Sequence, residues 1–222
     1  TFVVGILSAR RGSTAPAICP GCTLLVRSIF PETAPMENSI PSALPEELAA
    51  AIIDVVDARV HVVNMSAALA QPSPNGERAL EQALDYAAQH GVIAVAAAGN
   101  QGTVGSSAIT RHPWVIPVAG CDIQGRPMSM SNLGSSIGRR GLSAPGDNIT
   151  SLGPEGKPQS FGGTSAATPF VTGAIALLLS EFPRANAALV KLAVTQASTP
   201  RRRAVVPPLL DAWASFRMMG AA

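Results

Sequence analysis

The sequence predicts an α/β fold in which a mostly parallel central sheet carries helices on both faces. Short apolar runs alternate with longer amphipathic segments along the chain, as they do in repeated strand–helix units. Residues 92–98 are apolar without a break, which is typical of a parallel strand buried on both faces. The segment 170–179 is apolar on every helical face, so we expect a central buried helix there.

The composition fits one compact domain over residues 1–222. Hydrophobic residues make up 47% of the chain and charged residues 14%, values that favour a buried sheet over a disordered chain. The formal net charge of +2 indicates no nucleic acid or other polyanionic partner. The apolar run 170–179 is too short to cross a bilayer, so no membrane span is expected.

Apolar spacing separates the two kinds of element in chain order. Longer segments with apolar residues three and four apart predict helices, and shorter β-branched runs predict strands. In order, the expected elements are a strand at 24–29, a helix at 46–58, a strand at 60–65, a helix at 77–90, strands at 92–97 and 114–119, a strand and hairpin within 148–161, the helix that follows Ser165, and helices at 187–197 and 208–218. Proline-rich segments at 31–45 and 71–76 predict loops.

A glycine-rich turn before the buried helix predicts a nucleophilic serine. Gly162 and Gly163 permit a tight turn, Thr164 is a good N-cap, and Pro169 is tolerated in a first helical turn, where N–H groups have no partners. Ser165 then lies where backbone N–H groups and the positive end of the helix dipole meet, an arrangement that suits a developing oxyanion. The alternative is a glycine-rich turn that only caps a core helix.

A second polar residue is expected beside Ser165. The buried strand at 92–97 is followed by Gly99 and Asn100, and ligand sites of open α/β sheets lie at the carboxyl ends of the strands. An asparagine there can donate its side-chain amide to the oxyanion that the N–H of Ser165 faces.

Together these two segments resemble the subtilisin-like serine proteases, the subtilases. Ser165 matches the nucleophile of the family and Asn100 its oxyanion-hole amide. Four further segments match in the order of the family: 1–9, 20–26, 62–66 and 143–149. Segments 17–30 and 141–146 also resemble the proteases that trim cyanobactin precursors.

The catalytic Asp and His of the family are not matched within this sequence. The resemblance implies that both lie upstream of residue 1, together with the N-terminal strand and the start of the first helix. Asp54 and Asp57 are expected to be surface charges on an amphipathic helix. His61 is expected within a strand, His90 at the end of a helix and His112 in a turn, so none of the three is expected to serve Ser165.

Two other nucleophile arrangements fit less well. An α/β-hydrolase needs its acid and then its histidine after the serine, and no histidine follows Ser165. An N-terminal threonine nucleophile at Thr1 is disfavoured because Thr1 opens the run 1–9 that the family match already explains.

The resemblance also implies a set of substrate-binding residues. Met65, Ser66 and Ala67 would pair with the substrate backbone as an added strand. Ala68 stands where many relatives have glycine, which affects the depth of the pocket. The residues expected to line the pocket or the nucleophile turn are Ala97, Ala98, Gly99, Gln101, Gly163 and Thr164. This pocket is expected to be small, apolar and uncharged.

The function implied is a serine endopeptidase that forms an acyl-enzyme at Ser165, without a cofactor. The alternative is a catalytically dead pseudoprotease that binds peptides in the same groove. Expected partners are a peptide or protein substrate and the chain's own N-terminal segment or propeptide. Secretion is usual for the family, whereas a peptide-maturation protease would act in the cytoplasm.

The three cysteines and the loop after Ala9 are the candidates for a metal site or a disulfide. Cys19 and Cys22 have the spacing of a redox or zinc pair, but zinc would need two more ligands and no second pair exists. Buried packing and a local disulfide both stay open for this pair, and Cys121 is expected to be a buried thiol. The loop after Ala9 is poor in Asn and Asp, so we expect no calcium site there.

Overall fold

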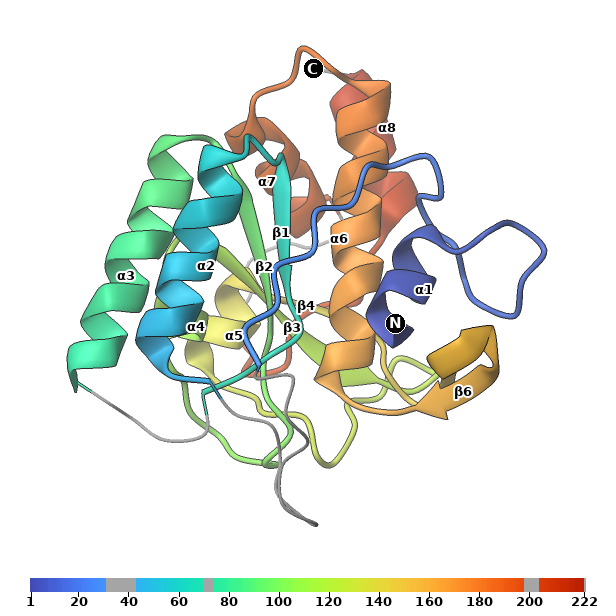
Figure 1. Ribbon diagram of the computed structural model, residues 1–222, viewed down its shortest axis with the longest axis horizontal. Helices are drawn as coiled ribbons and strands as arrows, with labels where there is room; N and C mark the ends of the chain where they lie inside the picture. The colour runs from blue at the N-terminus through green and yellow to red at the C-terminus, as the bar shows by residue number, and fades with distance from the viewer. Residues whose placement is uncertain (31–42, 70–73, 198–203, 222) are drawn as a thin grey trace.

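The structure is a computed structural model that describes residues 1–30, 43–69, 74–197 and 204–221 (Figure 1). Most of the predicted linker at 31–45 and part of the predicted loop at 71–76 lie outside the described residues. The rest of the chain forms a sheet between two helical layers, which confirms the predicted α/β class.

The central sheet has four parallel strands in the order β1-β2-β3-β4. Their bounds are β1 (Val62–Met65), β2 (Ile93–Ala97), β3 (Val115–Cys121) and β4 (Leu142–Pro145). Every crossover between consecutive strands contains at least one helix, as parallel pairing requires. A separate antiparallel hairpin joins β5 (Ile149–Leu152) and β6 (Pro158–Phe161), in the region where a hairpin was predicted.

Helices cover both faces of the sheet. They are α1 (Phe2–Ser8), α2 (Pro45–Asp57), α3 (Pro74–Gln89), α4 (Ala108–Arg111), α5 (Ser135–Arg140), α6 (Thr164–Glu181), α7 (Ala187–Gln196) and α8 (Ala212–Gly220). The short helices α4 and α5 and the strand β4 were not predicted. In the part of the chain that the structure covers, we find no helix long and apolar enough to cross a membrane.

Alternate residues of β2 enter two different cores. Ile93 and Val95 pack with α6 and α7, whereas Ala94 and Ala96 pack with α2 and α3. Full burial of a side chain of the size of Ile93 or Val95 stabilises the fold by about 1.5–3 kcal/mol relative to an exposed one. This arrangement explains why the strand is apolar at every position.

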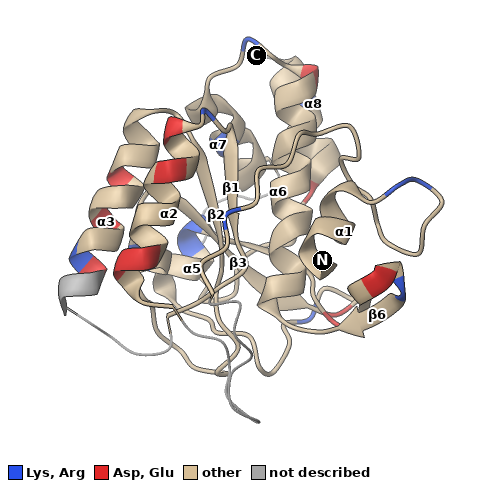
Figure 2. Cartoon of the chain, viewed as in Figure 1, with Lys and Arg blue, Asp and Glu red and all other residues tan. Residues whose placement is uncertain are grey.

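Helix α6 occupies the centre of the fold. It packs against all four strands of the sheet, and Glu181 at its last position is its only charged residue. Figure 2 shows the contrast with α2 and α3, whose outer faces carry many of the acidic residues. The prediction of a central buried helix is confirmed.

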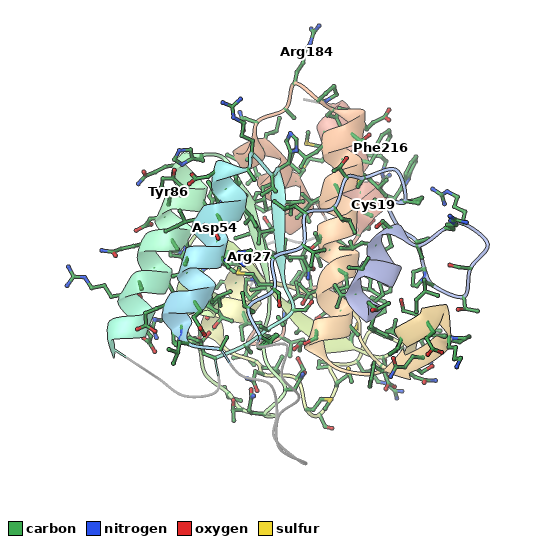
Figure 3. All side chains as sticks on the ribbon, viewed as in Figure 1. Cys19, Arg27, Asp54, Tyr86, Arg184 and Phe216 are labelled. Atoms are coloured by element: carbon green, nitrogen blue, oxygen red, sulfur yellow. The ribbon has the colours of Figure 1, made fainter. Side chains whose placement is uncertain are left out.

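The predicted strand near Leu24–Ile29 is wrong. This segment has no regular secondary structure, and Leu25 and Val26 are 54% and 71% exposed. Its composition favours a strand, but a strand forms only where a neighbouring backbone supplies hydrogen bonds. The segment is instead attached to α2 through an ion pair between Arg27 and Asp54, with Nε and Oδ2 2.9 Å apart (Figure 3).

Candidate active site

The turn before α6 differs in detail from the prediction. Gly163, not Thr164, is the N-cap residue, with φ of 126°, a conformation that glycine adopts without strain. A Cβ at this position would lie 3.0 Å from Nδ2 of Asn100. Thr164 is the first helical residue and is fully buried.

Thr164 orients the side chain of Asn100. Its backbone N–H and its hydroxyl both donate to Oδ1 of Asn100, at 2.9 and 3.0 Å. The same hydroxyl oxygen accepts from the N–H of Gly99 at 3.2 Å. Because Oδ1 of Asn100 already accepts two hydrogen bonds, the amide is held with Nδ2 available to donate to a ligand.

Ser165 lies beside Asn100 at the start of α6, as predicted. The side chain is half-buried, and no residue within the described ranges accepts a hydrogen bond from the N–H of Ser165. Its Oγ donates to the carbonyl of Ser66 at 2.9 Å, and Oγ of Ser66 donates to the carbonyl of Ser165 at 3.0 Å. Two N–H donors, on Ser165 and Asn100, are therefore free near the hydroxyl of Ser165.

Pro169 lies in the second turn of α6, so the predicted first-turn position is wrong. At this position proline lacks the N–H that an interior helical residue normally donates to the carbonyl four residues earlier. That carbonyl belongs to Ser165. The donor it receives is the hydroxyl of Ser66.

The predicted substrate-binding residues lie around the carboxyl edge of the sheet. Met65 ends β1 and is buried, Ser66 and Ala67 are half-buried just beyond it, and Ala68 is exposed. Ala97 ends β2, and the residues that follow it are Ala98 and Gly99, both buried, and Gln101, which is exposed. The fold thus brings these segments to the same edge as the start of α6.

Asn132 is a residue of this site that the sequence analysis missed. Its Oδ1 accepts from the N–H groups of Gln101 and Thr103 and from the hydroxyl of Thr103, at 3.0 to 3.1 Å. Its Nδ2 donates to the carbonyl of Ala98 and to Oε1 of Gln101, at 3.2 and 2.6 Å. Asn132 therefore holds the loop that carries Asn100, although in sequence it resembles any turn asparagine.

All three histidines lie at the amino ends of the parallel strands, whereas Ser165 lies at the carboxyl ends. His61 directly precedes β1, and is not inside that strand as predicted; His90 and His112 precede β2 and β3. His112 is buried, with Nε2 3.1 Å from Oδ1 of Asp85. This pair has the composition of part of a catalytic triad, but the length of β3, about 20 Å, separates the two edges.

A groove with a volume of about 490 Å³ runs along β1. Strand β1 is at one end of the strand order, so among the described residues its backbone pairs with β2 alone. The groove lies between β1, the irregular segment 24–30 and the helices α1, α2 and α6, and Ser66 and Ala67 line it. It therefore begins at the candidate active site.

The cysteines are free thiols, not a disulfide. Burial, with a contribution from the neighbouring Cys22, raises the pKa of the Cys19 thiol to about 12. Burial and the adjacent Asp122 also raise the pKa of Cys121. Such thiols stay protonated at neutral pH and are poor nucleophiles. The residues that the structure describes contain no cluster of three or more His, Cys, Asp or Glu that could hold a metal ion.

Comparison with known sequences finds relatives of this chain among the subtilases. A model of the subtilase family matches residues 17–209. Subtilisin DY from Bacillus licheniformis is 31% identical over 204 residues, which cover 90% of this chain and 69% of that protein. Subtilisin E from Bacillus subtilis strain 168 is 37% identical over 126 residues, which cover 55% of this chain and 31% of that protein.

Solved structures of similar fold include the patellamide maturation protease PatA and the prenylagaramide maturation protease PagA. The self-cleaved protease domain of PatA is 30% identical with a TM-score of 0.85, and the match covers 100% of this chain and 83% of that one. The prenylagaramide maturation protease PagA is 27% identical with a TM-score of 0.88, over 99% of this chain and 81% of that one.

Proposed function

The chain belongs to the subtilase family of serine peptidases, and from that premise we propose that it hydrolyses peptide bonds through an acyl-enzyme at Ser165. The observation that carries this proposal is the pair of free donors beside the Ser165 hydroxyl, the N–H of Ser165 and Nδ2 of Asn100. Two such donors stabilise the negative charge that appears on the substrate oxygen as the tetrahedral intermediate forms.

In the proposed reaction, Oγ of Ser165 attacks the carbonyl carbon of the scissile bond. A histidine takes the hydroxyl proton and passes it to the leaving amine, and a carboxylate holds that histidine in the correct tautomer. We assign the histidine and the carboxylate to the segment that precedes Thr1 in the full-length protein. The placement of His61, His90 and His112 at the far edge of the sheet supports this assignment.

The hydroxyl of Ser165 must turn before it can react. It donates to the carbonyl of Ser66, and an amide carbonyl is too weak a base to accept the proton. Redirecting the hydroxyl toward an imidazole would convert it into a nucleophile. In the residues that the structure describes, the Ser165 hydroxyl is therefore not activated as a nucleophile.

The proposed substrate is an extended peptide or protein segment. It would pair with Met65, Ser66 and Ala67 at the end of β1 as an added strand and place one side chain near Ala97, Ala98, Gly99 and Gln101. Gln101 is the only polar side chain of this group, so small uncharged side chains would be preferred. PatA and PagA are maturation proteases, which makes precursor peptides the first class to test.

We infer a second partner for the groove along β1, namely the chain's own N-terminal segment or a propeptide. The free edge of β1 offers unpaired backbone groups, and the lining of the groove is mostly apolar. An extended segment in this groove would pair with β1 and cover both features.

Labelling with a fluorophosphonate tests the nucleophile in the full-length protein. We expect one labelled serine, Ser165, and no hydrolysis of a peptide library by the Ser165→Ala variant, with an unchanged circular dichroism spectrum. Ser180→Ala, an exposed serine of the same helix, is the matched control and should keep full activity. Modification of another serine would refute the assignment, and peptide binding without labelling or hydrolysis would favour the pseudoprotease.

A further inference from the structure

Helix α6 leaves the carbonyl of its candidate nucleophile without a helical donor. In an α-helix the carbonyl of each residue accepts from the N–H four residues later. For Ser165 that residue is Pro169, which has no N–H. A half-buried carbonyl without a donor is unfavourable, and here it belongs to the residue whose position matters most for the proposed reaction.

The hydroxyl of Ser66 takes the place of the missing N–H. It donates to the carbonyl of Ser165 at 3.0 Å, although the two residues lie 99 positions apart in sequence. The carbonyl of Ser66 in turn accepts from Oγ of Ser165 at 2.9 Å. Two hydrogen bonds of opposite direction therefore join the end of β1 to the first turn of α6.

A relay of side chains directs the Ser66 proton toward Ser165. Nδ2 of Asn64 donates to Oγ of Ser66 at 2.8 Å, so the hydroxyl oxygen accepts on that side. Oδ1 of Asn64 accepts from the hydroxyl of Thr172 at 2.8 Å. The chain of hydrogen bonds thus starts on α6 at Thr172, passes through β1 and returns to α6 at Ser165, and each bond polarises the next.

We propose that Ser66 is a positioning residue for the nucleophile, an inference that rests on the proposed function. Its hydroxyl fixes Ser165 on the carboxyl side, while the contacts between Thr164 and Asn100 fix it on the amino side. The proline in the second turn makes this contact necessary, because it removes the donor that the helix would otherwise supply.

Kinetics of Ser66 variants of the full-length protein test this role. Ser66→Ala is expected to lower kcat roughly tenfold, the kinetic equivalent of one hydrogen bond, with little change in KM. Ser66→Thr keeps the hydroxyl and should restore most of kcat. Ser180→Ala removes an exposed hydroxyl from the same helix and serves as the control. A rise in KM at constant kcat would instead mean that Ser66 contributes only to substrate binding.

A double-mutant cycle with Pro169 isolates the proposed contact. Pro169→Ala returns an N–H to the helix at the position that faces the carbonyl of Ser165. In the Pro169→Ala background, Ser66→Ala is therefore expected to lower kcat about twofold or less, because the carbonyl keeps a donor. An equal loss of kcat in both backgrounds would overturn the proposal.

The same cycle in urea unfolding separates this inference from the proposed function. Ser66→Ala should lower the urea midpoint more in the presence of Pro169 than in the Pro169→Ala background, whether or not the protein hydrolyses peptides. Equal shifts of the midpoint would overturn the contact. Absence of hydrolysis by the unmodified full-length protein, with unequal shifts, would refute the proposed function and leave the contact supported.

Discussion

The hydrogen bonds that Oδ1 of Asn100 accepts fix the orientation of its side chain. Thr164 supplies two hydrogen bonds to Oδ1 of Asn100, and the hydroxyl of Thr164 is itself held by the N–H of Gly99. These bonds hold the amide group of Asn100 in one orientation, with Nδ2 free to donate. A donor fixed in advance stabilises developing charge better than one that must reorganise.

Replacing Asn100 tests its proposed role in stabilising the oxyanion. In the full-length protein, Asn100→Ala is expected to lower kcat about 100- to 1000-fold with little change in KM, because the amide acts on charge that exists only in the transition state; this magnitude is taken from subtilisin itself. Steady-state kinetics on one peptide substrate measure it. An unchanged kcat would place the oxyanion elsewhere.

Lys191 links stability to pH at a site far from Ser165. Burial, with a smaller contribution from Arg140, lowers the pKa of Lys191 from 10.5 to about 8, and Nζ donates to the carbonyl of Pro113 at 2.7 Å. Because the pKa is lower in the folded than in the unfolded chain, the unfolded chain binds more protons between these two values. The contribution of Lys191 to stability therefore rises as pH increases from about 8 to about 10.5.

Urea unfolding at pH 7.5 and pH 10 checks this sign. The free energy of unfolding of the unmodified chain should rise between these values relative to that of Lys191→Met, which has no titrating group. The thiol of Cys19, whose pKa is raised, works in the opposite direction, but it is present in both proteins and cancels in the difference. A difference that falls with pH would contradict the prediction.

At the scale of elements, the prediction was most accurate for two helices, α2 and α7. The helices predicted at 46–58 and 187–197 differ by one residue from α2 and α7. Asn186 caps α7, because its Oδ1 accepts from the N–H of Leu189 at 2.8 Å. A capping side chain alone does not make a helix start predictable, because α8 begins at Ala212 after its cap Asp211, four residues later than predicted.

Elements and site contacts that depend on distant residues could not be predicted. The segment Leu24–Ile29 has the composition of a strand, but no strand among the described residues pairs with it. Thr164 was predicted to be the N-cap of α6, because the sequence does not reveal its contacts with Asn100. Ser165 and Asn100 were nevertheless predicted to meet, because both follow from the polarity of a parallel sheet. The role of Asn132 depends on a loop conformation that no pattern in the sequence encodes.

A matched pair of substitutions in α6 tests the packing of the central helix. Ile175 is fully buried between α6 and the sheet, whereas Leu177 is 47% exposed. Ile175→Ala is expected to lower the free energy of unfolding by about 2–5 kcal/mol, and Leu177→Ala by less than about 0.5 kcal/mol. Urea unfolding of both variants measures the difference. Similar losses would mean that α6 is not packed as described.

At the scale of the whole molecule, the fold keeps the candidate nucleophile Ser165 apart from the three histidines. Each histidine precedes a parallel strand, whereas Ser165 lies in the first turn of α6, at the carboxyl ends of the strands. Side-chain rotation cannot close such a distance. The part of the chain that the structure describes therefore places no histidine beside Ser165 and the proposed oxyanion donors.

The 222-residue chain alone should consequently be almost inactive. Loss of the catalytic base costs on the order of a millionfold in kcat, a magnitude known from subtilisin. A peptide-library assay on the purified chain checks this, run alone and with the preceding segment of the full-length protein added in trans. Robust cleavage by the chain alone, abolished by Ser165→Ala, would mean that His61, His90 or His112 acts as the base.

The pair formed by His112 and Asp85 provides an internal spectroscopic probe. The imidazole is 6% exposed, its Nε2 lies 3.1 Å from Oδ1 of Asp85 and its Nδ1 accepts from the N–H of Trp114, so its ring C–H resonance in a proton NMR spectrum reports on the packing around His112. The length of β3 separates this resonance from the chemistry at Ser165. A substitution at the serine edge that leaves the signal in place has changed the site alone, and one that erases it has disturbed the sheet as well.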